Sequence, residues 1–405
     1  MEMPPSVYEA INEMFQCNSF VEHLACFKQF YEELKDCLFI VFSEHSTCSL
    51  PEPLKTNYEN NFAIINIGSS NQFYAVNDKI YQEMIYQGKS NYTIDTCIDL
   101  DTQAVSYLRK CFKDYDQKPD ISKLNDLLEF LNSPNLDYSC HPYLIENATK
   151  NFNKIDCYSN INSFVLFKNF EYDKFIRYGI YEYRANKETM ILDTDCIYKY
   201  ISSQIFTEEF KDIYRVQRAI YIILSKAICI EFNNSKKSAK NKMMELLDFI
   251  NTQLGFVAER ELNVCYYYFL HHESTKKFFK NIQRNACNMS KTINGMSWDL
   301  AHIRFLEQEC TYIPDKKSVF SIHVLLTYDN GLKEILKINP IEQIAIYNGV
   351  SVVKFKHQLI DYVPEAEEKL LSEANMLHRK EIFNKLDIDA LYISMKQEID
   401  NVCRL

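Results

Sequence analysis

The chain has 405 residues, of which 47% are hydrophobic and 14% aromatic, and its 45 Lys and Arg against 55 Asp and Glu give a formal net charge of −10. This apolar content excludes intrinsic disorder as the main state, and only seven Gly argue against a glycine-rich nucleotide-binding loop. The acidic balance argues against a broadly basic nucleic-acid-binding surface, but not against a nuclease, whose site must itself be acidic to hold metal ions.

The cysteines, the first residues and the most apolar run indicate the cellular compartment. The 14 Cys are scattered through apolar stretches without a CxxC pair, as expected for small buried hydrophobes in a reducing environment, and a structural zinc knuckle is disfavoured. The first residues lack the basic and apolar regions of a signal peptide. The most apolar run, 219–232, is interrupted by Ser225, Lys226 and Glu231, so it predicts a buried helix. We therefore expect a cytoplasmic protein without a membrane partner.

The first ninety residues predict a mixed α/β unit over 1–92. Apolar side chains recur at helical spacing through 7–40, with Phe20, Leu24 and Phe27 on one face. Phe62 to Ile67 then predicts a short strand that ends at Gly68.

The pattern changes at Tyr92. A β-prone run from Thr93 to Thr102 leads at once into a helical pattern from Ala104 to Phe112, so this strand delivers carboxylates at its C-terminal end. In open α/β sheets that edge is where active sites are built. Residues 121–131 and 141–153 predict two further helices.

Residues 154–285 predict an all-helical insertion, since turn signals and strand character are scarce there. The long helical patterns within it are Phe206–Phe232, Lys240–Leu254 and Glu259–His271. Strand signals return at Ser321–Thr327, with a helix from Leu332, and at Gln343–Tyr347, which turns at Asn348-Gly349. Residues 361–405 predict C-terminal helices.

Four acidic residues share one kind of context, because each is expected at the end of a strand or early in a helix that packs on it. They are Asp101, Glu146, Asp299 and Asp329. Carboxylates gathered in this way raise one another's pKa unless a cation neutralises them, and hard oxygen ligands select Mg²⁺ or Mn²⁺. Such ions would lower the pKa of a bound water and stabilise the attacking and leaving oxygens at a phosphodiester.

These four segments resemble the acidic motifs of the PIN-like nuclease superfamily, in their usual chain order. The first is Ile98-Asp99-Leu100-Asp101-Thr102-Gln103, with Gln103 where that family usually has Asn. Glu146 matches the family's Glu on an early helix, Trp298-Asp299-Leu300 its Asp beginning a helix, and Thr327-Tyr328-Asp329 its strand followed by Thr-x-Asp. The long interval between Glu146 and Asp299 departs from a minimal PIN domain and requires a large insertion.

The resemblance implies an α/β fold with a PIN-like α/β/α parallel sheet over 93–153 and 286–360, interrupted by the helical insertion. It also implies metal-dependent cleavage of nucleic acid, with RNA favoured over DNA, in which Asp101, Glu146, Asp299 and Asp329 bind Mg²⁺ or Mn²⁺. A toxin or phage-defence effector would fit such a large nuclease. Two alternatives stay open: a structure-selective DNA nuclease, and a non-catalytic helical interaction protein with a degenerate core whose carboxylates do not converge. Self-association or a protein partner is also left open.

Each of these residues has a second interpretation. A single Asp after a strand often serves only as a helix N-cap, and Asp99 competes with Asp101 for the first position. A rival motif, Asp193-Thr194-Asp195, is expected to cap a helix rather than to end the first core strand. Thr327 is either a ligand of substrate or metal-bound water, or a strand-end hydroxyl bonded to backbone. His302 lies one helical turn after Asp299, where it either faces the same site or packs in the core.

Two basic clusters are candidates for contact with a phosphate backbone. The first comprises Lys236, Lys237, Lys240 and Lys242; the second comprises Lys276, Lys277, Lys280 and Arg284. The usual role of such runs is a solvated helix face, and we favour the second cluster for substrate contact because it precedes the Asp299 motif.

Overall fold

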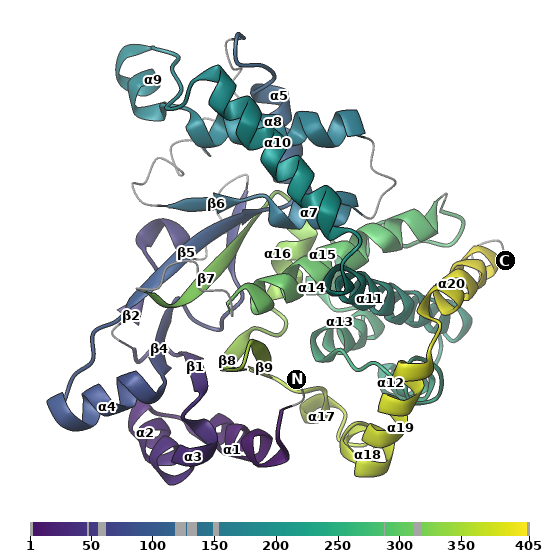
Figure 1. The fold of residues 1–405 in the computed structure, drawn as a ribbon. Helices are drawn as coiled ribbons and strands as arrows, with labels where there is room; N and C mark the ends of the chain where they lie inside the picture. Colours follow the sequence, from purple (N-terminus) through teal and green to yellow (C-terminus); the bar gives the residue numbers. More distant parts are fainter. Residues whose placement is uncertain are drawn as a thin grey trace.

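The computed structural model describes residues 3–46, 48–55, 62–117, 127, 136–148, 154–286, 288–310 and 318–402 (Figure 1). Its strands are β1 (Cys37–Phe42), β2 (Cys48–Ser49), β3 (Ala63–Asn66), β4 (Gln72–Val76), β5 (Thr93–Leu100), β6 (Asp137–Ser139), β7 (Ser318–Thr327), β8 (Ile341–Tyr347) and β9 (Val350–Phe355). Its principal helices are α1 (Pro5–Gln16), α2 (Phe20–Gln29), α3 (Tyr31–Leu34), α4 (Asp78–Gln87), α5 (Thr102–Cys111), α7 (His141–Ala148), α8 (Lys154–Asn169), α9 (Tyr172–Tyr178), α10 (Lys187–Gln204), α11 (Glu208–Asn233), α12 (Ala239–Phe249), α13 (Glu259–Phe269), α14 (Glu273–Lys276), α15 (Met289–Glu309), α16 (Asn330–Leu336), α17 (Leu359–Tyr362), α18 (Ala366–Leu371), α19 (Glu373–Lys385) and α20 (Ile388–Val402).

The sheet that carries the predicted acids has the strand order β3-β7-β5-β6. β5 pairs in parallel with both β6 and β7, and β3 closes the β7 edge in the antiparallel direction. β7 is a nearly continuous apolar run that is buried along most of its length, as expected for a parallel strand covered on both faces. The α/β fold expected from the sequence is thus confirmed, as are the strand at Thr93–Leu100 and the helix that follows it.

A second, antiparallel sheet joins the two ends of the chain. Its order is β2-β4-β1-β8-β9, so strands from the first eighty residues pair with strands of 341–355. The predicted N-terminal unit therefore contributes to both sheets, because β3 belongs to the first. Helices α1, α2 and α3 cover β1 through a separate apolar cluster that includes Ile11, Met14 and Phe39. The helical pattern was expected to run through residue 40, but the chain becomes a strand at Cys37, where a run of six apolar residues begins.

The described part of 154–286 contains helices and no strand, apart from one isolated bridge between Phe170 and Tyr183. The predicted helices at 206–232, 240–254 and 259–271 are confirmed as α11, α12 with a following π-helical turn (Ile250–Leu254), and α13. α11 is buried almost all round between Ala219 and Ile230, because α12, α13, α15 and α20 pack against it. The C-terminal helices lie along this bundle in Figure 1.

The helix predicted at 121–131 lies outside the described residues except for Leu127, and the one predicted at 141–153 is described as far as Ala148. Within the described ranges, no helix combines the length and the hydropathy needed to cross a lipid bilayer.

Candidate functional site

Asp101 and Asp329 follow two neighbouring parallel strands, β5 and β7, and each begins the next helix. The Asp101 carboxylate accepts a hydrogen bond from the Ala104 N–H at 2.6 Å, and that of Asp329 accepts from the N–H groups of Gly331 and Leu332. Both acids are therefore N-caps of α5 and α16, as the simpler interpretation of their sequence context predicted. Capping does not exhaust a carboxylate, because its second oxygen keeps free lone pairs.

Thr327 joins the two caps. Its buried Oγ1 accepts the Asp329 N–H at 2.9 Å, and its hydroxyl hydrogen-bonds the Asp101 carboxylate. Burial raises the pKa of Asp101 to about 7, with the hydrogen bonds from Thr327 and Ala104 opposing and the carboxylates of Glu146 and Asp329 adding to the rise. Asp101 therefore holds its proton to a much higher pH than an exposed aspartate does.

Glu146 enters from α7, which lies over β5. Its buried Oε2 accepts a hydrogen bond from the Thr102 hydroxyl and lies 3.7 Å from His302 Nε2. His302 comes from α15, so α5, α7 and α15 meet at this point. The structure thus brings Glu146 and Asp329 each into electrostatic range of Asp101, with Thr327 between Asp101 and Asp329.

Asp299 occupies a different position from the one expected. The prediction that it begins a helix is wrong, because α15 begins at Met289 and Asp299 lies in its middle, half-buried. The residue before this helix, Asn288, has a φ of 65° and makes no side-chain capping bond. The sequence therefore gives little sign that a helix starts there. One turn after Asp299, His302 approaches Glu146, and Trp298 is buried in the core.

The rival motif Asp193-Thr194-Asp195 lies inside α10, which begins at Lys187 with Asn186 as its cap. The expectation that it caps a helix is therefore wrong, and it does not end a strand either. Thr194 donates to the Met190 carbonyl at 2.8 Å and Asp195 accepts from the Tyr158 hydroxyl at 2.8 Å. These contacts give the motif a structural role in packing α10 on α8.

The first basic cluster is largely occupied by acids. Lys237 pairs with Glu245 at 2.9 Å, Lys240 pairs with Glu365, and Lys242 is buried against Glu231 at 2.8 Å. Lys242 is therefore not available to a phosphate backbone, whereas the ion pairs of Lys237 and Lys240 are exposed.

The second basic cluster lies beside α16. A Cβ on Gly331 would come within 3.0 Å of the Phe278 Cα, which is why the chain has glycine where this segment crosses the helix. Lys276 pairs with Glu273 and Arg284 donates to the Phe232 carbonyl, whereas Lys277 and Lys280 are exposed. Burial first, and then the charge of Lys277, lower the pKa of Lys333 on α16. Positive charge therefore lies next to the helix that Asp329 caps.

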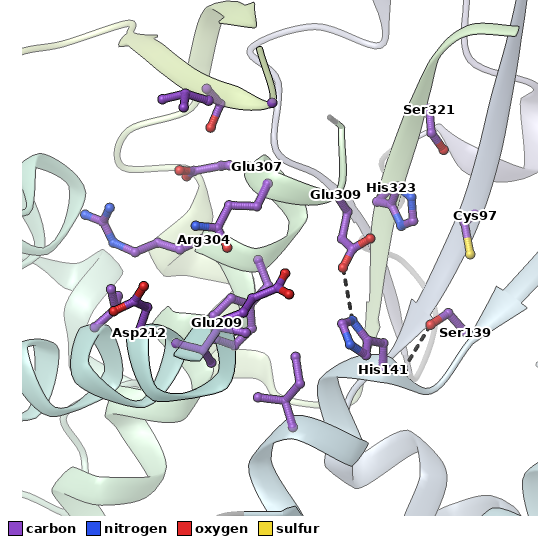
Figure 2. Close-up of a pocket in the computed structure, with 18 of the residues that line it drawn as sticks. Cys97, Ser139, His141, Glu209, Asp212, Arg304, Glu307, Glu309, Ser321 and His323 are labelled. Atoms are coloured by element: carbon purple, nitrogen blue, oxygen red, sulfur yellow. Dashed lines mark hydrogen bonds and ion pairs between the residues drawn. The ribbon is translucent and has the colours of Figure 1, made fainter. Parts of the chain in front are cut away.

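A second polar region occupies the middle of the same sheet, where a cleft of about 1690 Å³ opens (Figure 2). In register, Asp137 of β6, Cys97 of β5 and His323 of β7 stand in one row across the sheet, and Asp95 pairs with Ser321 in the next. Asp99 follows Cys97 on this face, since alternate residues of a strand share a face. The far wall of the cleft includes Arg304 and Glu307 of α15 (Figure 2).

Cys97, Asp99 and His323 form the tightest group of donors. His323 Nδ1 lies 2.7 Å from Asp99 Oδ2, and one ligand atom from each of the three residues lies within 4.8 Å of the others. Across the described ranges this is the one set of three His, Cys, Asp or Glu side chains that is so close, so Asp101, Glu146 and Asp329 are more widely spaced. Asp99, the competitor of Asp101 in the sequence, belongs to this second group.

Sequence reasoning missed Cys97 and His323 as candidates. A signal was present in the polar residues Asp95, Cys97 and Asp99 at alternate positions of an apolar strand, and in a histidine within the run Ser321–Thr327. Burial lowers the pKa of His323, but the hydrogen bond to Asp99 and the charge of Asp99 raise it by more. The pKa of His323 is therefore above its ordinary value. At the cleft wall, His141 Nδ1 lies 3.0 Å from Glu309 Oε1.

Comparisons of the chain with protein-family models, with curated proteins and with solved structures find no match.

Proposed function

We propose that this protein is a divalent-metal-dependent nuclease of the PIN-like type, with its active site at Asp101, Glu146 and Asp329 and with RNA as the favoured substrate. The observation that carries the proposal is the Asp101 carboxyl group, which is buried at a strand end and whose pKa is raised to about 7 by burial and by two further carboxylates. A protein gains nothing in stability by gathering acids in this way, whereas a site that recruits a cation needs such a concentration.

The residues present suit Mg²⁺ or Mn²⁺, because all the donors are hard oxygens and none is a thiol or imidazole ligand of a softer metal. Asp101, Glu146 and Asp329 would hold the ion; Asp299, which the sequence predicted as the fourth acid, lies one turn before His302 in the middle of α15. At least one pair of these carboxylates is more than 4.8 Å apart, so at least one of the three would hold the ion through a bound water, and Mg²⁺ usually keeps several waters. When bound, the ion would activate a water and stabilise charge at the phosphate.

The chain's own residues supply the rest of the site. Capping bonds fix Asp101 and Asp329 on the rigid ends of β5 and β7, so that neither carboxylate depends on a mobile loop. The Thr327 hydroxyl links the two residues, because it bonds both the Asp101 carboxylate and the Asp329 N–H. Lys277 and Lys280 lie in the exposed segment beside α16. There they would contact the phosphate backbone and offset the negative charge of the acids.

Three features favour the PIN-like interpretation of the core. β6, β5 and β7 are parallel neighbours, acids follow β5 and β7, and the helical segment lies between β6 and β7 in the chain, where the large insertion is expected. The degenerate, non-catalytic alternative predicted carboxylates that do not converge, and the influence of both Glu146 and Asp329 on Asp101 argues against it.

The test is Mn²⁺- and Mg²⁺-dependent cleavage of end-labelled RNA and DNA by wild type and by Asp101→Asn. Asparagine keeps the capping oxygen and removes the charge, so the fold should survive while cleavage falls by roughly 10²-fold or more. Asp387→Asn is the matched control, because Asp387 caps the remote α20 by accepting from Ala390 N–H at 3.0 Å. Activity that persists in EDTA, or that is equal in Asp101→Asn and wild type, would disprove the proposal. Preferential cleavage of DNA would show that DNA, not RNA, is the substrate.

A further inference from the structure

Cys97 and His323 line the cleft at the middle of the sheet, and Asp99 is buried against His323; the proposed nuclease site uses none of the three. Cys97 and Asp99 project from β5 on the same face as His323 of β7, and Cys97 is the direct partner of His323 in the parallel ladder. Register therefore fixes the three donors on adjacent, rigid strands, which is how preorganised metal ligands are held.

The donor types differ from those at the strand ends. A thiol, a carboxylate and an imidazole together suit a borderline metal such as Zn²⁺, whereas Mg²⁺ and Ca²⁺ avoid sulfur. The three donor atoms lie within 4.8 Å of one another, and in a tetrahedral zinc site ligand atoms stand roughly 3.3–3.7 Å apart. The 2.7 Å contact between His323 and Asp99 needs to lengthen only modestly for a metal to take the place of the shared proton.

Two further observations point to a ligand at this place. Ser321, two residues before His323 on the same face, is only 1% exposed, yet its Oγ has no hydrogen-bond partner within the described structure; the buried Oδ2 of its ladder partner Asp95 likewise has none. Buried polar atoms normally find a partner, so both are expected to contact a bound water or ligand in the cleft. Asp137 and Glu309 add negative charge that acts on His323, which favours a cation.

We propose that Cys97, Asp99 and His323 bind one Zn²⁺ ion, with the fourth coordination position open to the cleft. Three protein ligands and an accessible fourth position are the arrangement of reactive zinc sites, whereas structural sites are closed by four protein ligands. The site is independent of the proposed nuclease centre, because it uses none of the same side chains and lies on the cleft that Asp101 and Glu146 do not line.

The experiment titrates full-length protein, stripped with a chelator, with Zn²⁺ in a calorimeter and with Co²⁺ in a spectrophotometer. We expect one tight equivalent of Zn²⁺ and, with Co²⁺, a thiolate-to-metal charge-transfer band. Cys97→Ser should remove that band, and Cys97→Ser and His323→Ala should each weaken Zn²⁺ binding by more than the roughly 10–100-fold loss that follows removal of an outer partner. Cys196→Ser is the control, since the thiol of Cys196 is exposed on α10.

A measurement on the wild type avoids dependence on the variants' folding. Zn²⁺ should slow alkylation of Cys97 and leave that of Cys196 unchanged, as read by mass spectrometry of the modified peptides. Asp101→Asn should bind Zn²⁺ as the wild type does, which separates this proposal from the nuclease proposal. The absence of a tight equivalent, a Co²⁺ spectrum without a thiolate band, or equal alkylation of Cys97 with and without Zn²⁺ would overturn it.

Discussion

The parallel sheet carries two polar regions, one at the ends of β5 and β7 and one in the middle of these strands, and they differ in how their residues come together. At the strand ends, Asp101 and Asp329 are placed by local structure, because each follows its own strand and caps its own helix. In the middle of the sheet, Cys97 and His323 meet only because β5 and β7 pair in one register. The acids of the first region offer oxygen ligands, with His302 beside Glu146, whereas the second region combines a thiol, an imidazole and a carboxylate.

This difference separates two kinds of chemistry on one scaffold. A strand-end carboxylate that is also an N-cap is held by backbone N–H groups and stays a hard ligand. Cys97 and His323 lie in mid-strand beside Asp99 and Asp137, where burial and the charges of these two acids raise the pKa of the Cys97 thiol. Such a thiol is a poor nucleophile without a metal. In the second region a cation would have to displace the thiol proton, whereas in the first region it would bind carboxylates.

The largest expected effect compares one glutamate from each region. Glu146→Gln should lower metal-dependent cleavage by roughly 10²-fold or more, because it removes a carboxylate beside Asp101. Glu309→Gln, which keeps a hydrogen-bond acceptor for His141 at the cleft, should leave the rate within about 3-fold of the wild type. Initial rates on labelled RNA at saturating Mn²⁺ measure both. A similar loss in the two variants would show that the regions act as one site.

The next effect compares two buried hydroxyls on β7. Thr327→Val should lower the free energy of unfolding by about 1–3 kcal/mol, because it leaves the Asp329 N–H and the Asp101 carboxyl without this partner. Ser321→Ala should change it by less than about 0.5 kcal/mol, since the Ser321 Oγ has no protein partner within the described ranges. Urea unfolding of metal-free protein measures both values. If Ser321→Ala cost as much as Thr327→Val, the cleft hydroxyl would be bonded in a way that the structure does not show.

The pH dependence of stability should differ between the regions. The pKa of Asp101 rises from 3.8 in the unfolded chain to about 7 in the fold, so the folded state keeps a proton that the unfolded chain has lost. Stability should therefore fall as pH rises across this window, by up to about 1.4 kcal/mol per pH unit, and Asp101→Asn should remove that slope.

His323 gives the contrasting window. Its folded pKa is above the ordinary 6.5, so its contribution is present below pH 6.5 and is lost as pH rises through the folded pKa. His323→Ala should flatten the curve above pH 6.5 and leave the slope below it. Urea unfolding of both variants and the wild type in chelator, from pH 4.5 to 8.5, gives the curves; an unchanged slope in Asp101→Asn would mean that this carboxyl titrates normally.

The smallest effect concerns the basic clusters. Lys277→Gln should weaken RNA binding a few-fold and lower the slope of log affinity against log salt by about 1, as expected for one lost phosphate contact. Lys240→Gln is the matched control, since Lys240 already pairs with Glu365. Filter binding in Ca²⁺, at several salt concentrations, measures both. Equal slopes of log affinity against log salt in the two variants would show that the second cluster does not contact the substrate.

Much of the core could be predicted from the sequence, because local patterns control it. The strand at Thr93–Leu100, its exit into a helix and the strand-end positions of Asp101 and Asp329 follow from alternation, apolar runs and capping. The helix start before Asp299 could not be predicted, since Asn288 provides no side-chain cap and the apolar pattern continues through Trp298.

By itself, the sequence determined the α/β alternation, the helical character of 154–285 and the acids at strand ends, because hydrophobic period and caps are properties of neighbouring residues. Only the tertiary structure decided that β1 pairs with β8, that Lys240 and Lys242 are taken by acids, and that His323 lies 2.7 Å from Asp99, 224 positions earlier. The reason is that alternation states which residues share a face of a strand, while the neighbour of that strand and its register are set by packing between distant segments.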